Sequence, residues 1–262
     1  MTNKIDERRE GAMAYSQFGG KLSDSLRVIN TFSLGEVTAY STMVKKVEDK
    51  AYDRGYFKTL GAGAYIDKPS VYLKRAAEGN KVMIDAGLMP AITRVAHDIQ
   101  RNLKPDASIF FGNEEFDPDI GEQGLPGFHV ISDNSDNRSG MFHVDMPYQR
   151  FYWPGPFTAP FTFTTLIETP DCGSGLWHWD DMSLEEGLRI IQETRNPTRS
   201  STQTPEEGRS LLMYEVGHTY VHSGRVPHAI ANTGDMKPGE YRITLQGHGA
   251  YIVEQNALLF YF

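Results

Sequence analysis

The pattern of residue types in the second half of the chain is the strongest indication of its fold. From Phe128 onward, short runs rich in β-branched and aromatic residues alternate with clusters of Gly, Pro, Asn and Asp. This alternation predicts short strands separated by turns. The candidate strands are Phe128–Ser132, Gly140–His143, Pro160–Glu168, Gly175–Trp179, Ser210–Val216, Thr219–Ser223, His228–Asn232, Tyr241–Gly247 and Ala257–Phe262. So many short strands suit a barrel of two sheets, and we expect a β core in residues 128–262.

The first half, residues 1–127, is predicted to be mostly helical. Its clearest helix is Leu88–Leu103, where apolar residues recur every three or four positions. A second helix is expected from Leu34 to about Tyr56, and a short third at Val71–Ala77, opened by Pro69. The length of 262 residues suits one β-barrel domain that carries accessory helices. We expect a single domain, 1–262, with the helical region flanking the β core.

One insertion interrupts the β half, near residues 180–207. A helix is expected at Ser183–Thr194, followed by a polar stretch from Asn196 to Glu207. Long stretches without structure of their own are often lids or binding loops, and otherwise surface excursions.

Charge and composition exclude several classes of function. The formal net charge is −8 and the isoelectric point is near 5.5, whereas nucleic-acid binders carry clustered Lys and Arg. No window is apolar enough to span a membrane. Cys172 is the only cysteine, so an internal disulfide is excluded and a reducing compartment fits. We expect a cytoplasmic protein that acts on small molecules, without nucleic-acid or membrane partners.

His143 and Asp145 are the first candidate metal ligands. Residues two apart on a strand point to the same face, so an imidazole and a carboxylate can reach one ion there. A distant histidine such as His228 completes a set of two histidines and one carboxylate, which leaves open positions on Fe(II). A second His-x-Asp motif, His178-Trp179-Asp180, is a rival for the same role.

The order of these motifs resembles the core of the Fe(II)/2-oxoglutarate-dependent oxygenase superfamily. His143-Val144-Asp145 is followed by the β run Phe161–Glu168, the Gly-rich turn Asp171–Gly175 and another β run, Leu176–Trp179. The distal histidine of the family matches Val226-Pro227-His228. The resemblance implies a double-stranded β-helix, or jelly-roll, core flanked by the N-terminal helices. It also implies that His143, Asp145 and His228 bind Fe(II).

Other histidines compete with His228 for the distal position. His222 and His218 lie further upstream of Arg242 than His228 does. The separation from either one to Arg242 is long for a connection of one turn and a neighbouring strand. His222 is instead a candidate to orient a ligand through a hydrogen bond.

Arg242-Ile243-Thr244 carries the expectation for the co-substrate. The family places an arginine after the distal histidine to bind the far carboxylate of 2-oxoglutarate, with a hydroxyl residue two positions on. A planar guanidinium suits a carboxylate because it donates two parallel hydrogen bonds. Arg242 and Thr244 are the matching residues.

The resemblance implies oxidation of a small-molecule metabolite by O2, with release of succinate and carbon dioxide. Hydroxylation, desaturation, cyclisation and epimerisation are all outcomes within the family. Asp145 favours oxygenation over halogenation, since related halogenases lack this carboxylate. Two alternatives remain: a cupin-type metal enzyme that does not use 2-oxoglutarate, and a non-catalytic small-molecule-binding barrel.

Overall fold

The fold was analysed in a computed structural model of the chain, which describes residues 22–55, 57–63, 67–112, 123–132, 142–150, 156–194, 205–231 and 235–262. The helices are α2 Leu22–Ser25, α3 Leu34–Lys46, α4 Pro69–Asp85, α5 Met89–Leu103 and α6 Leu184–Thr194. Single 3₁₀ turns cover Glu48–Lys50 and Pro147–Arg150. No helix among these residues is both long and apolar enough to cross a membrane.

Within the described residues, twelve strands build two sheets. Those of the first half are β1 Arg27–Asn30, β2 Tyr52–Asp53, β3 Lys58–Leu60 and β4 Ser108–Phe111. Those of the second half are β5 Gly127–Ser132, β6 Phe157–Glu168, β7 Gly175–His178, β8 Ser210–Met213, β9 His218–His222, β10 His228–Ala231, β11 Tyr241–Ile252 and β12 Ala257–Tyr261. The prediction of a mainly β protein with accessory helices is confirmed.

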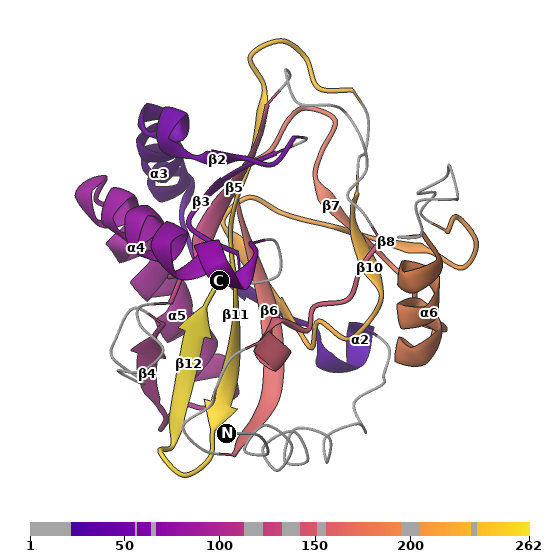
Figure 1. The fold of residues 1–262 in the computed structure, drawn as a ribbon. Helices are drawn as coiled ribbons and strands as arrows, with labels where there is room; N and C mark the ends of the chain where they lie inside the picture. Colours follow the sequence, from indigo (N-terminus) through magenta and orange to yellow (C-terminus); the bar gives the residue numbers. More distant parts are fainter. Residues whose placement is uncertain are drawn as a thin grey trace.

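The large sheet has the order β1-β9-β6-β11-β5-β3-β2, and β12 joins it through β11 and pairs with β4. The small sheet has the order β10-β7-β8. All pairings are antiparallel except β12 with β4. Figure 1 shows α3, α4 and α5 together on one side of the large sheet, with the small sheet and α6 on the other. The space between the two sheets is therefore the interior of the β core.

The main hydrophobic core lies between the large sheet and the helices. On α5, one stripe of apolar side chains is buried against the sheet, including Ile92, Val95 and Ile99. Helix α3 begins at a capping box, in which Ser33 and Glu36 satisfy each other's backbone N–H groups. Near the C-terminal end of α3, Lys45 forms an ion pair with Glu168 of β6, in which Nζ lies 2.7 Å from a carboxylate oxygen. The helical region thus fixes the outer face of the sheet.

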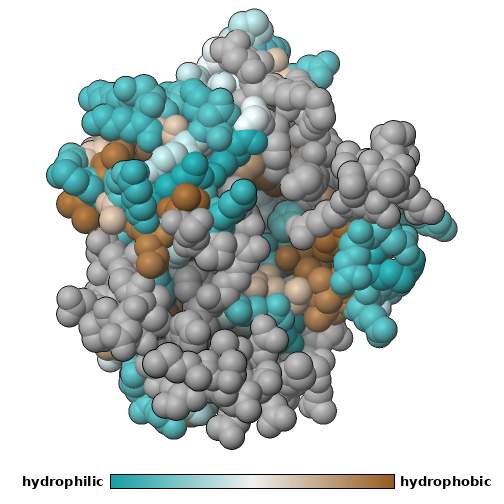
Figure 2. Space-filling view, in the orientation of Figure 1, coloured by the Kyte–Doolittle hydropathy of each residue, from teal (hydrophilic) through white to brown (hydrophobic). Residues whose placement is uncertain are grey.

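Helix α6 is the insertion expected in the second half. Gly187 and Ile191 are buried, while Glu185, Glu186 and Arg189 are exposed. Figure 2 shows the same division: hydrophilic residues cover the outer surface of this helix and hydrophobic ones gather on its inner side. The Cβ of a larger residue at Gly187 would lie 2.7 Å from Pro227, just before β10, so the helix packs closely on the small sheet.

Several boundaries differ from those expected. Helix α3 ends at Lys46 rather than near Tyr56, and α4 extends to Asp85 rather than Ala77. Strands β1 to β4 were not expected, because runs of two to four residues are too short to show a period. A strand was expected at Gly140–His143, and residues 140–141 of it lie outside the described part of the chain. A loop was expected at Asn196–Glu207, and residues 196–204 of it also lie outside that part.

Candidate metal centre and adjoining cavity

Main-chain hydrogen bonds hold His143 and His228 side by side. His143 N donates to His228 O and His228 N donates to His143 O, each at 2.9 Å. The two residues form an isolated antiparallel bridge at the start of β10. Directly paired residues project to the same face, and their ring centroids are 4.3 Å apart. Backbone pairing therefore aligns the two imidazoles before any ion binds.

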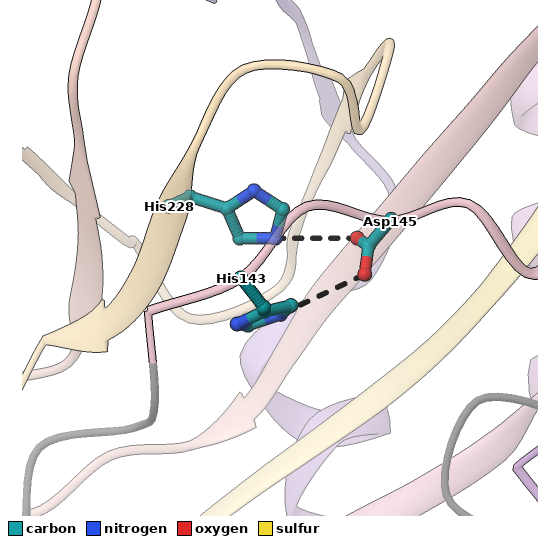
Figure 3. Close-up of side chains that lie close together, drawn as sticks. All are labelled: His143, Asp145 and His228. Carbon is teal, nitrogen blue, oxygen red and sulfur yellow. Dashed lines mark ion pairs between the residues drawn. The ribbon is translucent and has the colours of Figure 1, made fainter. Parts of the chain in front are cut away.

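Asp145 joins them from the same segment, although that segment is not a continuous strand as the sequence predicted. Only His143 makes a bridge, and the Asp145 N–H donates to Gly224 O at 2.8 Å. Asp145 Oδ2 lies 3.2 Å from His228 Nε2, and Oδ1 lies 3.6 Å from His143 Nε2. Figure 3 shows both rings directed at the carboxylate.

Gly224 makes room for this carboxylate. It has φ +68°, which disfavours other residues, and a Cβ there would lie 2.9 Å from Asp145 Cβ. Any side chain at Gly224 would push Asp145 out of place.

The donor set fits a divalent transition metal. One ligand atom from each of His143, Asp145 and His228 lies within 4.8 Å of the other two. His228 Nδ1 donates to Val226 O at 2.7 Å, so its Nε2 presents a lone pair to the centre. Two imidazoles and one carboxylate suit Fe(II) and related ions, and they leave coordination positions for other molecules.

The electrostatics of the three residues favour an ionised carboxylate. Burial alone would raise the pKa of Asp145, but the His228 and His143 imidazoles hold that pKa well below its usual range. Burial lowers the pKa of His228, whereas the Asp145 carboxylate and the Val226 carbonyl raise it, and the net shift is upward. The carboxylate is therefore ionised, and a metal ion at the centre would take the place of the proton that the raised pKa favours on His228.

The rival histidines lie outside this cluster. His178 Nδ1 is 3.0 Å from Asp180 Oδ1, and that carboxylate oxygen also accepts from Leu22 N. The His222 ring lies edge-on to His228 with centroids 5.3 Å apart, but its Nδ1 accepts the Gly224 N–H. His218 lies at the opposite end of β9. Among the described residues, the cluster able to hold a metal is His143, Asp145 and His228.

A cavity adjoins the cluster, and Arg242 lines the same cavity. Arg242 is buried on β11, and its Nε donates to Ser174 Oγ at 2.5 Å. The buried Tyr214 also lines it, and burial raises the pKa of this hydroxyl while Arg242 opposes the shift. The described lining residues are Phe57, His129, His143, Asp145, Thr162, Phe163, Thr164, Leu176, Tyr214, His228, Ile230, Arg242, Gln246, Gly247 and His248.

Thr244 lies two residues after Arg242 on β11, as the motif predicts. It is fully buried on β11, but among the described residues it is not part of the cavity lining. Its hydroxyl instead accepts a hydrogen bond of 2.8 Å from Gln246 Nε2. Gln246, two residues further along the strand, reaches the cavity.

Sequence reasoning missed the polar residues that support the cluster. Ser174 lies in the predicted Gly-rich turn, so its position could have drawn attention to it. Thr162 and Thr164 alternate with Phe161 and Phe163 in β6, and this alternation marks a polar face. His129 and His248 carried no such signal, because a lone histidine on a strand is usually structural.

Comparisons with known proteins bear on the fold of the chain. No protein-family model matches the sequence, and no curated protein matches it. Among solved structures, the chain resembles an N-substituted L-amino acid dioxygenase from Burkholderia ambifaria AMMD in complex with alpha-KG. The TM-score is 0.51 at 14% identity, over 91% of this chain and 86% of that one.

Two further structures are similar over most of the chain. A second structure of the Burkholderia ambifaria AMMD dioxygenase has a TM-score of 0.51 at 16% identity, over 91% of this chain and 86% of that one. HygX from Streptomyces hygroscopicus, with nickel and 2-oxoglutarate bound, has a TM-score of 0.46 at 14% identity, over 92% and 86%. The resemblance inferred from the motifs is confirmed at the level of the fold, which this chain shares with the Burkholderia ambifaria AMMD dioxygenase.

Proposed function

We propose that this chain is an Fe(II)- and 2-oxoglutarate-dependent oxygenase that acts on a small molecule with O2. The observation that carries the proposal is that His143, Asp145 and His228 share one cavity with the buried guanidinium of Arg242. Three metal ligands alone would suit many metalloproteins, including cupins. A buried arginine across the same cavity adds a site for a carboxylate, which is what this co-substrate requires.

The connectivity of the strands supports a double-stranded β-helix core. From β5 onward the chain passes back and forth between the sheets: β5, β6, β9 and β11 lie in the large sheet, and the His143 bridge, β7, β8 and β10 belong to the small one. These four strands are neighbours within the large sheet, in the order β9-β6-β11-β5, and His143 pairs with β10 at the edge of the small sheet. This alternation of the chain between two sheets is the pattern of a jelly roll. With it goes the proposal that the chain forms one domain.

In the proposed site each end of 2-oxoglutarate has its own partner. Arg242, which lines the cavity, binds the far carboxylate, and Ser174 accepts a hydrogen bond from Nε and so holds the guanidinium. Tyr214 and Thr164, which line the same cavity, are candidates for the hydroxyl contact expected of Thr244. His143, Asp145 and His228 hold the iron, which supplies oxidation by O2 coupled to decarboxylation of 2-oxoglutarate. The apolar walls, Leu176 and Ile230 among them, exclude water.

The substrate is expected to approach from the His143 side. The His143 side chain is 32% exposed, whereas Asp145 and His228 are 7% and 3% exposed. The open side of the metal centre therefore lies next to His143. Hydroxylation is the proposed outcome, and desaturation, cyclisation and epimerisation start from the same site.

Two measurements test the proposal. Anaerobic calorimetry with Fe(II) and then 2-oxoglutarate is expected to give stoichiometric binding of both, and His228→Ala is expected to remove the metal. Mass spectrometry of reactions with a metabolite extract, Fe(II), O2 and isotope-labelled 2-oxoglutarate should then detect labelled succinate together with an oxidised metabolite. Iron binding without 2-oxoglutarate binding would favour the cupin alternative, and absence of metal binding would favour a non-catalytic barrel.

A further inference from the structure

A chain of hydrogen bonds behind Asp145 connects it to a histidine outside the metal cluster. Thr162 Oγ1 donates to Asp145 Oδ2 at 2.9 Å, and the same oxygen lies 2.7 Å from His248 Nδ1. All three side chains are buried, with 8% or less of each residue exposed. Water therefore does not compete for these bonds.

The hydrogens in this chain can be assigned from its chemistry. A carboxylate only accepts, so the single hydrogen of the Thr162 hydroxyl goes to Asp145. The hydroxyl oxygen must then accept from His248, which places the imidazole hydrogen on Nδ1. Burial also lowers the pKa of His248 to about 4, consistent with a neutral ring that carries one N–H. The direction of donation is His248 to Thr162 to Asp145.

The backbone fixes this arrangement. Thr162 and His248 are direct cross-strand partners in the β6–β11 pairing, so their side chains share the inner face. On the other side, a Cβ at Gly224 would lie 3.0 Å from Thr162 Oγ1 and 2.9 Å from Asp145 Cβ. Asp145 is thus held between a main-chain bond to Gly224 O and a side-chain bond to Thr162.

We propose that Thr162 and His248 are positioning residues, which fix the rotation of the Asp145 carboxylate and so raise the affinity of the site for its metal. An unrestrained carboxylate loses rotational freedom when it binds an ion, and a hydroxyl bond made in advance lowers that cost. Hydrogen bonds to metal ligands typically contribute 10–100-fold to metal affinity. The inference rests on the metal site of the proposed function and does not depend on 2-oxoglutarate.

The test measures the dissociation constant for Fe(II), or for Co(II) as a stable substitute, by anaerobic calorimetry on matched variants. Thr162→Val removes the hydroxyl at nearly constant shape, and Thr162→Ser keeps it. His248→Asn places an amide N–H near the position of Nδ1, whereas His248→Gln places it nearer Nε2. We expect about 10–100-fold weaker metal binding in T162V and H248Q. T162S and H248N should stay close to the wild type.

Thr165→Val is the matched control on the same strand. Thr165 is also buried, and its hydroxyl is hydrogen-bonded to Thr219 Oγ1 at 2.7 Å, away from the cluster. It should lose similar stability but keep its metal affinity. Melting temperatures without metal identify any variant that is not folded, and the His248 pair remains decisive if T162V does not fold.

The outcomes separate this inference from the proposed function. Wild-type protein that binds no metal would overturn both. Wild-type binding with unchanged affinity in T162V would overturn the positioning role alone. Equal affinities in H248N and H248Q would overturn the assignment of the imidazole hydrogen, and with it the direction of the chain.

Discussion

The two faces of the large sheet use the same strands for opposite purposes. On the outer face, Phe128 of β5 and Leu245 of β11 are buried in the core shared with α3, α4 and α5. Their sequence neighbours His129 and Gln246 line the cavity on the inner face. On these two strands, core residues therefore alternate with residues that line the cavity. A buried residue on these strands can therefore line the cavity instead of belonging to the hydrophobic core.

The largest effect is expected at the metal ligands. His143→Ala or Asp145→Ala removes a direct ligand, and turnover should fall by about 1000-fold or more, roughly 4 kcal/mol. The bridge to His228 uses only backbone atoms, so the fold should remain. Succinate release and the melting temperature of the metal-free protein measure the two effects. Turnover at the wild-type rate in either variant would refute the assignment of that residue as a metal ligand.

A substitution on the outer face should give the reverse result. Phe128 is fully buried, and Phe128→Ala should lower the free energy of unfolding by about 3–5 kcal/mol through loss of packing and the cavity left behind. Urea unfolding measures this change. At a temperature where the variant is folded, its metal affinity should match the wild type. A large loss of metal affinity in the folded variant would show that the two faces are coupled.

Arg242→Gln tests the far end of the cavity. The substitution removes the charge that binds the carboxylate, so the dissociation constant of 2-oxoglutarate should rise by about 10–100-fold, or about 1.5–3 kcal/mol. Metal affinity should change little, because Arg242 is not a ligand in the cluster. Sequential calorimetry with metal and then 2-oxoglutarate separates the two constants. Unchanged co-substrate binding would contradict the role proposed for Arg242.

Acid should destabilise the inner face through its neutral histidines. Burial lowers the pKa of His129 to about 3, while the unfolded chain titrates near 6.5. Between these values the unfolded state binds the extra proton, so stability falls as the pH falls below 6.5, by up to about 1.4 kcal/mol per pH unit. His129→Asn should reduce the slope of unfolding free energy against pH between 5 and 6. An identical slope would show that His129 is not the group responsible.

Strong local patterns made much of the fold predictable. The helical stripe at Leu88–Leu103 became α5, and alternation in the second half located β5 to β12 to within a few residues. The residue types of the cluster were also readable, because few side chains bind metals. The pairing that brings His143 to His228 was not, since backbone pairing depends on the whole sheet.

The finer chemistry depended on tertiary contacts. The rule that a hydroxyl two residues after the arginine faces the same ligand led to Thr244, whose hydroxyl accepts a hydrogen bond from Gln246 Nε2. Ser174 reaches Arg242 only because the turn before β7 folds back over β11. His248 supports Asp145 through Thr162, a contact between strands distant in sequence. None of these follows from local spacing.

The backbone bridge between His143 and His228 has a consequence for redesign. Since main-chain atoms make the link, the side chains at these two positions can be exchanged without cutting it. The backbone therefore fixes the spacing between these two positions, and other metal-binding side chains can be placed there by substitution. Altering the ion that the proposed site prefers would then depend on side-chain chemistry, separately from the pairing of the two segments.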